Sequence, residues 1–371
     1  MYRRGLLHTP SHTIANSDKL EERVIPTVIP KIIVGELFIT DGNTPKLSVL
    51  NSCHKDSRPD SMNISEVISS REQDFAVVGL RTVMAELAIV PELGGRVISV
   101  RSRRTGREWC WHRPRPDWLW TNQAYDDFGT SPQAGVDECV PSVARCEWRG
   151  RSIPDHGEVW FQRWKLDPAE LAAGRLHAVV RLPISPFVFT RTIRAEASDV
   201  FIFEYTLTNT SNAAEPFLWS LHPLFNICPG DRLELPAGVG SLRLNGGLGV
   251  PIAFGDTWTY PEPFPGVWLD RLEVPGAPPG CVKGFTGPLE EGRAALVNDA
   301  SGDRLELRWD ARVTPLLGLW LNRGHAGFHH VALEPTNGAP DSLADAVERW
   351  KHHGTVDAGG TARWAVSWQV T

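Results

Sequence analysis

The chain of 371 residues lacks the features that mark several common functional classes. Its formal net charge is −6, and basic and acidic residues are mixed along the chain, so nothing draws it generally to nucleic acid or anionic membranes. No apolar run approaches the roughly 18 residues of a membrane span. The start, MYRRGLLHTPSHT, has no apolar core of a secretory signal. We therefore expect a cytoplasmic protein without nucleic-acid or membrane partners; the oligomeric state is left open.

Cysteine motifs and nucleotide motifs are also missing. The six cysteines include no CxxC pair, and a chain of this length does not need disulfides, so reduced thiols are expected. There is no glycine-rich phosphate loop and no alternation of strands with helices. A nucleotide-binding fold is therefore not expected.

Helical periodicity is scarce, whereas alternation of apolar and polar residues is common. This period of two argues for half-buried strands in antiparallel sheets. The 33 glycines and 29 prolines indicate many turns. The clearest predicted strands are 175–182, 201–208, 304–309 and 361–370. Many strands with almost no helix predict an all-β sandwich or barrel.

One segment, 341–354, has a helical pattern that Asp341 or Ser342 could cap and Gly354 could end. Residues 1–61 hold short apolar pieces without sustained periodicity, and we expect a poorly ordered extension there. The alternative is a genuine N-terminal strand or arm. The remaining residues, 62–371, are predicted to form one domain.

Four short segments carry the candidate functional side chains. DHGEVW places His156 near Asp155 and Glu158, and on a strand His156 and Glu158 would share one face. His222 lies in an apolar strand, and Glu334 follows another apolar run. A fourth segment places Asp137 in a loop before a short strand. Each residue also has a structural interpretation: His222 as a hydrogen-bonded core residue, Glu334 as part of a turn.

Taken together, five segments resemble the aldose 1-epimerases of the galactose mutarotase-like superfamily. They occur in the family's order and span roughly residues 75–370. They are PELGGRVISVRSRRTGREWCW (91–111), GVDECVPS (135–142), DHGEVW (155–160), LHPLFNICPGDRLELP (221–236) and LEPTNGAPDSLADA (333–346).

The resemblance implies a fold and a set of roles. The fold would be a β-supersandwich of large twisted antiparallel sheets with a carbohydrate cleft on one of them. By motif, His222 falls on the general acid and Glu334 on the general base. His156, Arg96 and Asp137 fall on sugar contacts. A tryptophan wall could stack on the sugar, with Trp160 the first candidate and Trp111 the second. The basic stretch 101–107 is interpreted as a surface hairpin turn, not as a phosphate site.

The implied reaction interconverts the α and β anomers of a small-molecule sugar. The C1 hydroxyl loses a proton, the ring oxygen gains one, the C1–C2 bond rotates, and the ring closes on the other face. A carboxylate and an imidazole suffice as base and acid, and they exchange roles on closure. No metal, nucleotide or other cofactor is required.

Two other functions compete with this one. The scaffold could bind carbohydrate without catalysis. Alternatively, His156, Glu158, His222 and Glu334 could hold a transition metal in a sugar isomerase or a lyase. The His-Gly-Glu turn departs from the His-Gly-Gly turn of well-known mutarotases, so the substrate stays open.

Overall fold

The structure is a computed structural model that describes residues 64–272 and 280–371. The predicted extension over 1–61 and its boundary lie outside the described residues. All four predicted strands are present, as β8 (Arg175–Arg181), β10 (Val200–Asn209), β19 (Asp303–Trp309) and β23 (Thr361–Val370). They all belong to one seven-stranded antiparallel sheet.

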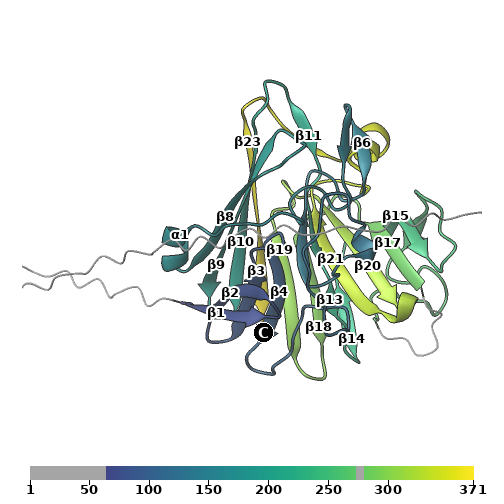
Figure 1. Ribbon diagram of the computed structural model, residues 1–371. Helices are drawn as coiled ribbons and strands as arrows, with labels where there is room; N and C mark the ends of the chain where they lie inside the picture. Colours follow the sequence, from purple (N-terminus) through teal and green to yellow (C-terminus); the bar gives the residue numbers. More distant parts are fainter. Residues whose placement is uncertain (1–63, 273–279) are drawn as a thin grey trace, which may run out of the picture. The chain divides into compact units, whose positions relative to one another are not determined.

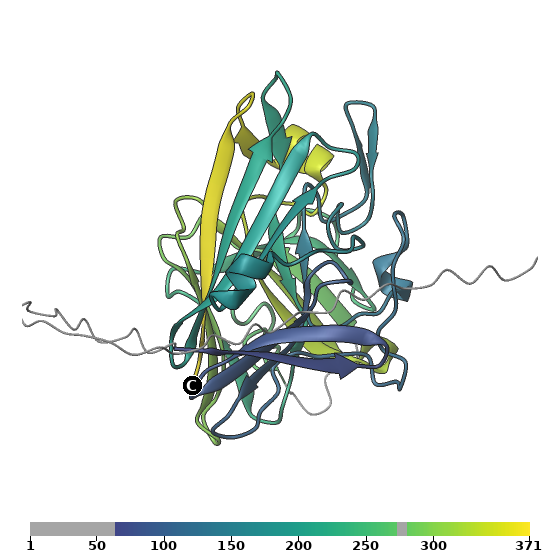
Figure 2. The same ribbon diagram turned by 60° about the vertical axis from the view of Figure 1, so that its left-hand side comes forward.

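The remaining strands of this sheet complete an order of β14, β18, β19, β23, β10, β9 and β8. Figures 1 and 2 show β23, in yellow, beside the teal strands β10 and β9. The additional strands are β9 (Phe187–Ala197), β14 (Asp231–Glu234) and β18 (Gly292–Asn298).

A larger, twelve-stranded antiparallel sheet supplies the other half of the fold. Its order is β1, β2, β3, β4, β5, β12, β21, β20, β17, β15 and β16, and β13 pairs with β21 off this path. The bounds are β1 (Glu66–Glu72), β2 (Phe75–Arg81), β3 (Ala85–Val90), β4 (Arg96–Ser102), β5 (Val136–Cys139), β12 (Ser220–Pro223), β13 (Phe225–Asn226), β15 (Ser241–Leu248), β16 (Thr257–Thr259), β17 (Gly280–Phe285), β20 (Leu316–Arg323) and β21 (His329–Thr336).

The hydrophobic core lies between the two sheets. Alternate residues of the seven-stranded sheet, such as Phe203 and Trp368, are fully buried in one cluster with residues of the larger sheet. The ring centroid of Phe225 on β13 lies 5.6 Å from that of Trp368, and the ring centroid of Trp219 lies 4.9 Å from that of Tyr205. Burial of each such side chain contributes roughly 1.5–3 kcal/mol. Much of the tryptophan content is therefore structural.

A polar cluster crosses this apolar core. Glu138 on β5 is fully buried and accepts hydrogen bonds from Arg191 on β9, Tyr205 on β10 and the indole of Trp219. The Arg191 guanidinium also donates to the carbonyl of Gly95. The buried positive charge of Arg191 is thus paired with the negative charge of Glu138 on the opposite sheet, as a buried ion requires.

The segment containing Asp137 and Glu138 is strand β5, and the prediction of a loop there is wrong. Asp137 pairs with His222 across β12, and Glu138 pairs with Leu221. All four residues of β5 are buried, which removes the apolar–polar alternation that would have revealed a strand.

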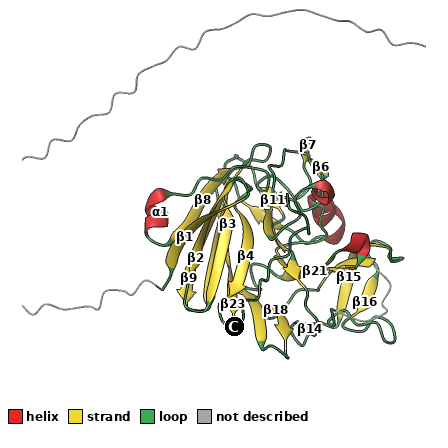
Figure 3. Cartoon of the chain, turned by 60° about the horizontal axis from the view of Figure 1, so that its bottom comes forward, coloured by secondary structure: helices red, strands yellow, loops and turns green. Residues whose placement is uncertain are grey.

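Helices are short and peripheral, as Figure 3 shows in red. They are α1 (Pro168–Ala172), α2 (Leu343–Asp345), the single π-turn η3 (Ala346–Trp350) and the 3₁₀ turns η1 (Phe128–Thr130) and η2 (His325–Gly327). No helix among the described residues is long and apolar enough to cross a membrane.

The C-terminal helix is shorter than the predicted 341–354. Ser342 is the N-cap and accepts a hydrogen bond from the amide of Asp345. The helical path ends at Trp350, because Lys351 takes a left-handed conformation with φ of 61°. Gly354 instead begins β22 (Gly354–Val356), which pairs with β11 (Glu215–Phe217).

Candidate functional site

A cavity of about 540 Å³ opens on the larger sheet, over strands β12, β15, β17, β20 and β21. Figure 1 shows β15, β17, β20 and β21 side by side in this part of the sheet. Loops around η1 and η2 form its rim. The lining includes His156, His222, Lys283, Asp341, His330, Trp320, Asn322, Asn245, Phe128 and Phe328. This volume suits a small organic molecule, since such pockets usually measure about 300–1,000 Å³.

His222 and Glu334 meet at the wall of this cavity. Ser220 pairs with Thr336 between β12 and β21, so two residues further along each strand His222 and Glu334 stand opposite each other on one face. The His222 Nε2 atom lies 3.8 Å from Oε1 of Glu334. His222 lines the cavity, whereas Glu334 is fully buried directly behind it.

Burial dominates the ionisation of both groups. It lowers the pKa of His222 well below its usual value, and His156, Lys283 and His330 lower it further. It raises the pKa of Glu334, although Lys283 opposes that effect. Oε1 of Glu334 and Nδ1 of His222 have no hydrogen-bond partner among the described residues. Both atoms therefore keep unused hydrogen-bonding capacity.

Lys283 on β17 is the third member of this group. Its buried ammonium donates to Oε2 of Glu334 and lies 3.5 Å from Oδ1 of Asp341. The amide of Asn245 on β15 donates to the other carboxylate oxygen of Asp341, at 2.8 Å. Two carboxylates thus surround one cation, and Lys283 lines the cavity between them.

His156 reaches the cavity from a turn. It is not on a strand as predicted, because His156 has φ of 56° and Gly157 has φ of 74°. A Cβ atom on Gly157 would lie 2.3 Å from the carbonyl oxygen of Val140, so this position requires glycine. The imidazole stacks on Phe128 at 3.8 Å and its Nδ1 lies 3.1 Å from Oδ1 of Asp155. The ring centroid is 4.7 Å from that of His222.

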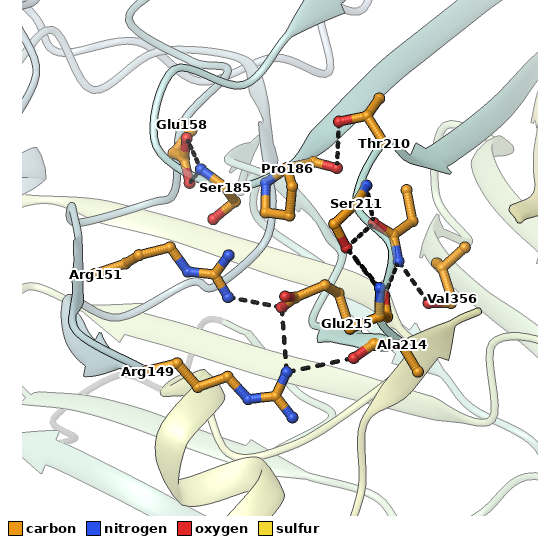
Figure 4. A network of polar contacts seen from close by, with 12 residues as sticks. Arg149, Arg151, Glu158, Ser185, Pro186, Thr210, Ser211, Ala214, Glu215 and Val356 are labelled. Atoms are coloured by element: carbon orange, nitrogen blue, oxygen red, sulfur yellow. Dashed lines mark hydrogen bonds and ion pairs between the residues drawn. The ribbon is translucent and has the colours of Figure 1, made fainter. Parts of the chain in front are cut away.

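Glu158 does not share a face with His156. Its carboxylate is buried and accepts hydrogen bonds from the backbone amides of Ile184 and Ser185, as Figure 4 shows for Ser185. In the same view, Arg149 and Arg151 both hold Glu215 at the base of β11. Glu158 thus has a structural role. The prediction that His156 and Glu158 lie on one face of a strand is wrong.

The position of Glu158 also bears on the alternative function, in which four side chains would hold a metal ion. The four donors His156, Glu158, His222 and Glu334 do not converge, because Glu158 is engaged with the backbone away from the cavity. Within residues 64–272 and 280–371, no group of three or more histidine, cysteine, aspartate or glutamate side chains has the spacing to hold a metal ion.

Three residues predicted to contact the sugar, Arg96, Asp137 and Trp160, do not line the cavity, and their role in binding stays a prediction. Arg96 and Asp137 are buried and paired at 2.9 Å, and neither lines the cavity. Trp160 is fully buried, packs edge-on to Phe128 at 5.6 Å and donates its indole N–H to the carbonyl of Asp155. Trp160 therefore supports the turn that holds His156, whereas Arg96 also donates to the carbonyl of Pro132. Trp111 is also buried, against His330.

Several cavity residues were not predicted from the sequence. Neither Lys283 nor Asn245 lies in a motif or in a strand predicted from the sequence. Asp341 was interpreted only as a helix cap. His330 also lines the cavity, whereas its neighbour His329 on β21 is exposed and does not. The side chains on β17 and β15 lie near His222 and Glu334 because these strands follow β20 in the strand order of the larger sheet.

The comparisons with known proteins concern the fold. No family model and no curated protein matches the chain. Solved structures do: a galactose mutarotase-like protein from Lactobacillus casei is 17% identical, with a TM-score of 0.56 over 82% of this chain and 100% of that one. A galactose mutarotase-like protein from Clostridium acetobutylicum is 12% identical, with a TM-score of 0.57 over 83% and 98%.

A third match is a candidate aldose 1-epimerase from Escherichia coli K12. It is 15% identical, with a TM-score of 0.58 over 83% of this chain and 99% of that one. At these identities the likeness concerns architecture, and it agrees with the large antiparallel sheets described above. The chain therefore has the galactose mutarotase-like fold, as its motifs predicted.

Proposed function

We propose that this protein interconverts the α and β anomers of an aldose by acid–base ring opening and closure. The observation that supports this most is the convergence of His222 and Glu334, far apart in the chain, within 3.8 Å at the wall of a cavity. A carboxylate and an imidazole so close together can hold one shared proton. Ring opening needs one general acid and one general base, and this pair can supply both.

The proposed steps follow the movement of that proton. With one proton on the pair, the unprotonated group accepts the proton of the C1 hydroxyl while the protonated group donates to the ring oxygen. The C1–O5 bond breaks and the aldehyde forms. After rotation about C1–C2, the two groups exchange roles and the ring closes. The pair again holds one proton, so no net proton is consumed.

The cavity walls would hold the sugar during these steps. The Phe128 ring, stacked with His156, and Trp320 offer apolar faces, while Asn322 offers an amide. Polar groups among apolar walls fix the orientation of a bound ligand and so lower the entropic part of the barrier. A role in carbohydrate metabolism and a cytoplasmic location belong to this proposal.

The test is anomer exchange measured by saturation-transfer NMR on a panel of aldoses. We expect the protein to accelerate exchange for at least one sugar. His222→Ala and Glu334→Gln should each lower that rate by about 10²–10⁴-fold, since positioned proton transfer contributes that much. His329→Ala is the control, because His329 is the exposed neighbour of His330 on β21. Full activity in either site variant would contradict the mechanism.

Binding without catalysis is a second candidate. The full burial of Glu334 favours it, since in this structure the carboxylate does not line the cavity. In that case sugars would bind with ordinary ligand-induced shifts, and no aldose of the panel would show accelerated exchange.

A further inference from the structure

The most unusual feature of the cavity is a buried lysine beside the proposed proton-transfer pair. Lys283 contacts Glu334 directly, lines the cavity and belongs to neither of the strands that carry the pair. The role of Lys283 inferred from these contacts rests on the proposed function.

Several groups face Glu334, and they differ in charge. Lys283 approaches from β17, His222 from β12 and Asp341 from the segment after β21. His156, which lies in a turn, interacts electrostatically with Glu334 and lowers the pKa of that carboxyl. The buried Cys139 thiol of β5 interacts electrostatically with both Glu334 and Lys283. Lys283 is the only lysine or arginine among the residues that line this part of the described cavity.

The geometry holds this cation in place. One carboxylate, Glu334, accepts a hydrogen bond from the ammonium, and a second carboxylate, Asp341, lies 3.5 Å from it. Asn245 fixes Asp341 in turn. An ammonium between two carboxylates has little tendency to give up its proton, so Lys283 is better suited to hold charge than to transfer a proton.

We propose that Lys283 is a positioning residue that sets the protonation state of the His222–Glu334 pair. An isolated carboxylate buried as deeply as Glu334 would hold its proton, and it could then not accept one from a sugar hydroxyl. The adjacent ammonium stabilises the ionised carboxylate. It thereby keeps the pair at one shared proton at neutral pH, the state that the reaction requires.

The sign of the effect follows from the charges. Loss of the positive charge makes each proton bind the pair more tightly. Both limbs of a bell-shaped pH–rate profile should therefore move to higher pH. Loss of the negative charge of Asp341 should move both limbs to lower pH. A purely structural role would lower the rate and leave the limbs in place.

The first experiment compares pH–rate profiles of anomer exchange for the wild type, Lys283→Met, Lys283→Arg and Asp341→Asn. We expect Lys283→Met to shift both limbs upward by about 1–3 pH units, the effect of one close opposite charge. Lys283→Arg should keep the limbs near the wild type, because arginine retains the charge. Asp341→Asn should shift them downward. Unshifted limbs in an active Lys283→Met protein would overturn the proposal, as would Lys283→Arg behaving like Lys283→Met.

The second experiment does not need activity. The imidazole of His222 is titrated by NMR in the wild type and in Lys283→Met, with thermal unfolding as the check of folding and His222→Gln to assign the signal. The midpoint should rise in Lys283→Met. If no aldose is turned over but the midpoint rises, the proposed function fails while the action of Lys283 on the pair stands. If aldoses are turned over and the midpoint is unchanged, the proposal about Lys283 fails. Should Lys283→Met not fold, the opposite shift in Asp341→Asn decides the question in the same way.

Discussion

At the scale of single residues, His330 shows how strongly the cavity wall controls ionisation. Its Nε2 accepts a hydrogen bond from the indole N–H of Trp320 at 3.1 Å, and its ring lies 4.4 Å from that of Trp111. Burial lowers the pKa of His330 to about 3, with a smaller contribution from His329. A proton on Nε2 would also face the Trp320 N–H. The neutral imidazole is therefore the native form.

This arrangement makes stability depend on pH. Below about pH 6.5 the unfolded chain protonates His330 while the folded protein does not, so folded stability falls as the pH drops toward 3. Between pH 6.5 and pH 5 the loss should be about 2 kcal/mol. On acidification from pH 6.5 to pH 5, we expect His330→Gln to lose about 2 kcal/mol less free energy of unfolding than the wild type. Urea denaturation at each pH measures this difference. His329→Gln, at the exposed neighbouring position, should follow the wild type. Parallel curves for His330→Gln and wild type would contradict this explanation.

At the scale of elements, the end of the C-terminal helix is set by tertiary pairing. The sequence pattern continues to Gly354, yet η3 stops at Trp350 and Lys351 takes the left-handed conformation. The chain must turn there because Gly354–Val356 pairs with Glu215–Phe217. Left-handed backbone costs a residue with a side chain about 1–2 kcal/mol, which glycine avoids.

Lys351→Gly should therefore stabilise the protein. The expected gain in the free energy of unfolding is about 1 kcal/mol, reduced by the greater freedom of glycine in the unfolded chain. The matched variant Lys351→Ala keeps the strained backbone and loses only the exposed hydrogen bond to the carbonyl of Val347, so it should gain nothing. Equal stability of the glycine and alanine variants in urea denaturation would show that the left-handed backbone stores no strain.

The same scale shows what the sequence could predict. Four strands of the seven-stranded sheet, β8, β10, β19 and β23, were predicted almost to the residue, because their apolar and polar residues alternate. Strand β5 was not, because burial on both faces removes the alternation. The turn at His156 was predicted as a strand, because no residue pattern in the sequence indicates that a histidine takes a left-handed backbone conformation.

The site was predictable only in part for a related reason. His222 and Glu334 were found by motif, and their cross-strand placement follows from neighbouring strands. Lys283 and Asn245 lie on strands that pair beyond β20, and this order cannot be read from local periodicity. Burial of Arg96 and Trp160 was likewise invisible, because a side chain that supports a loop and one that touches a ligand have the same chemistry.

At the scale of the whole molecule, the two sheets are joined by ions as well as by apolar packing. Glu138 of the larger sheet and Arg191 of the smaller one form a fully buried pair at 3.2 Å. Removal of one buried partner leaves the other charge without compensation, which commonly costs about 3–5 kcal/mol. Replacement of both by apolar residues avoids that penalty.

A comparison of a single variant with a double variant tests this view of the core. Glu138→Gln should lower the free energy of unfolding by about 3–5 kcal/mol. The Glu138→Met, Arg191→Met double variant should recover only part of that loss, because the buried Tyr205 hydroxyl and Trp219 indole lose their acceptor. The exposed Glu147→Gln on β6 (Cys146–Trp148) serves as the surface control and should change stability little. If the double variant is less stable than Glu138→Gln alone, the pair contributes more than mutual charge compensation.

Strand β5 gives these observations a common consequence. Asp137 and Glu138 are adjacent, yet one pairs with Arg96 beneath the ligand cavity and the other with Arg191 in the inter-sheet core. A single peptide unit thus separates a buried ion pair behind the cavity wall from the ion pair that joins the two sheets. Selection for a different ligand cannot readily shift this strand without weakening the fold. New specificities on this scaffold should therefore arise from the rim loops around η1 and η2, while β5 stays fixed.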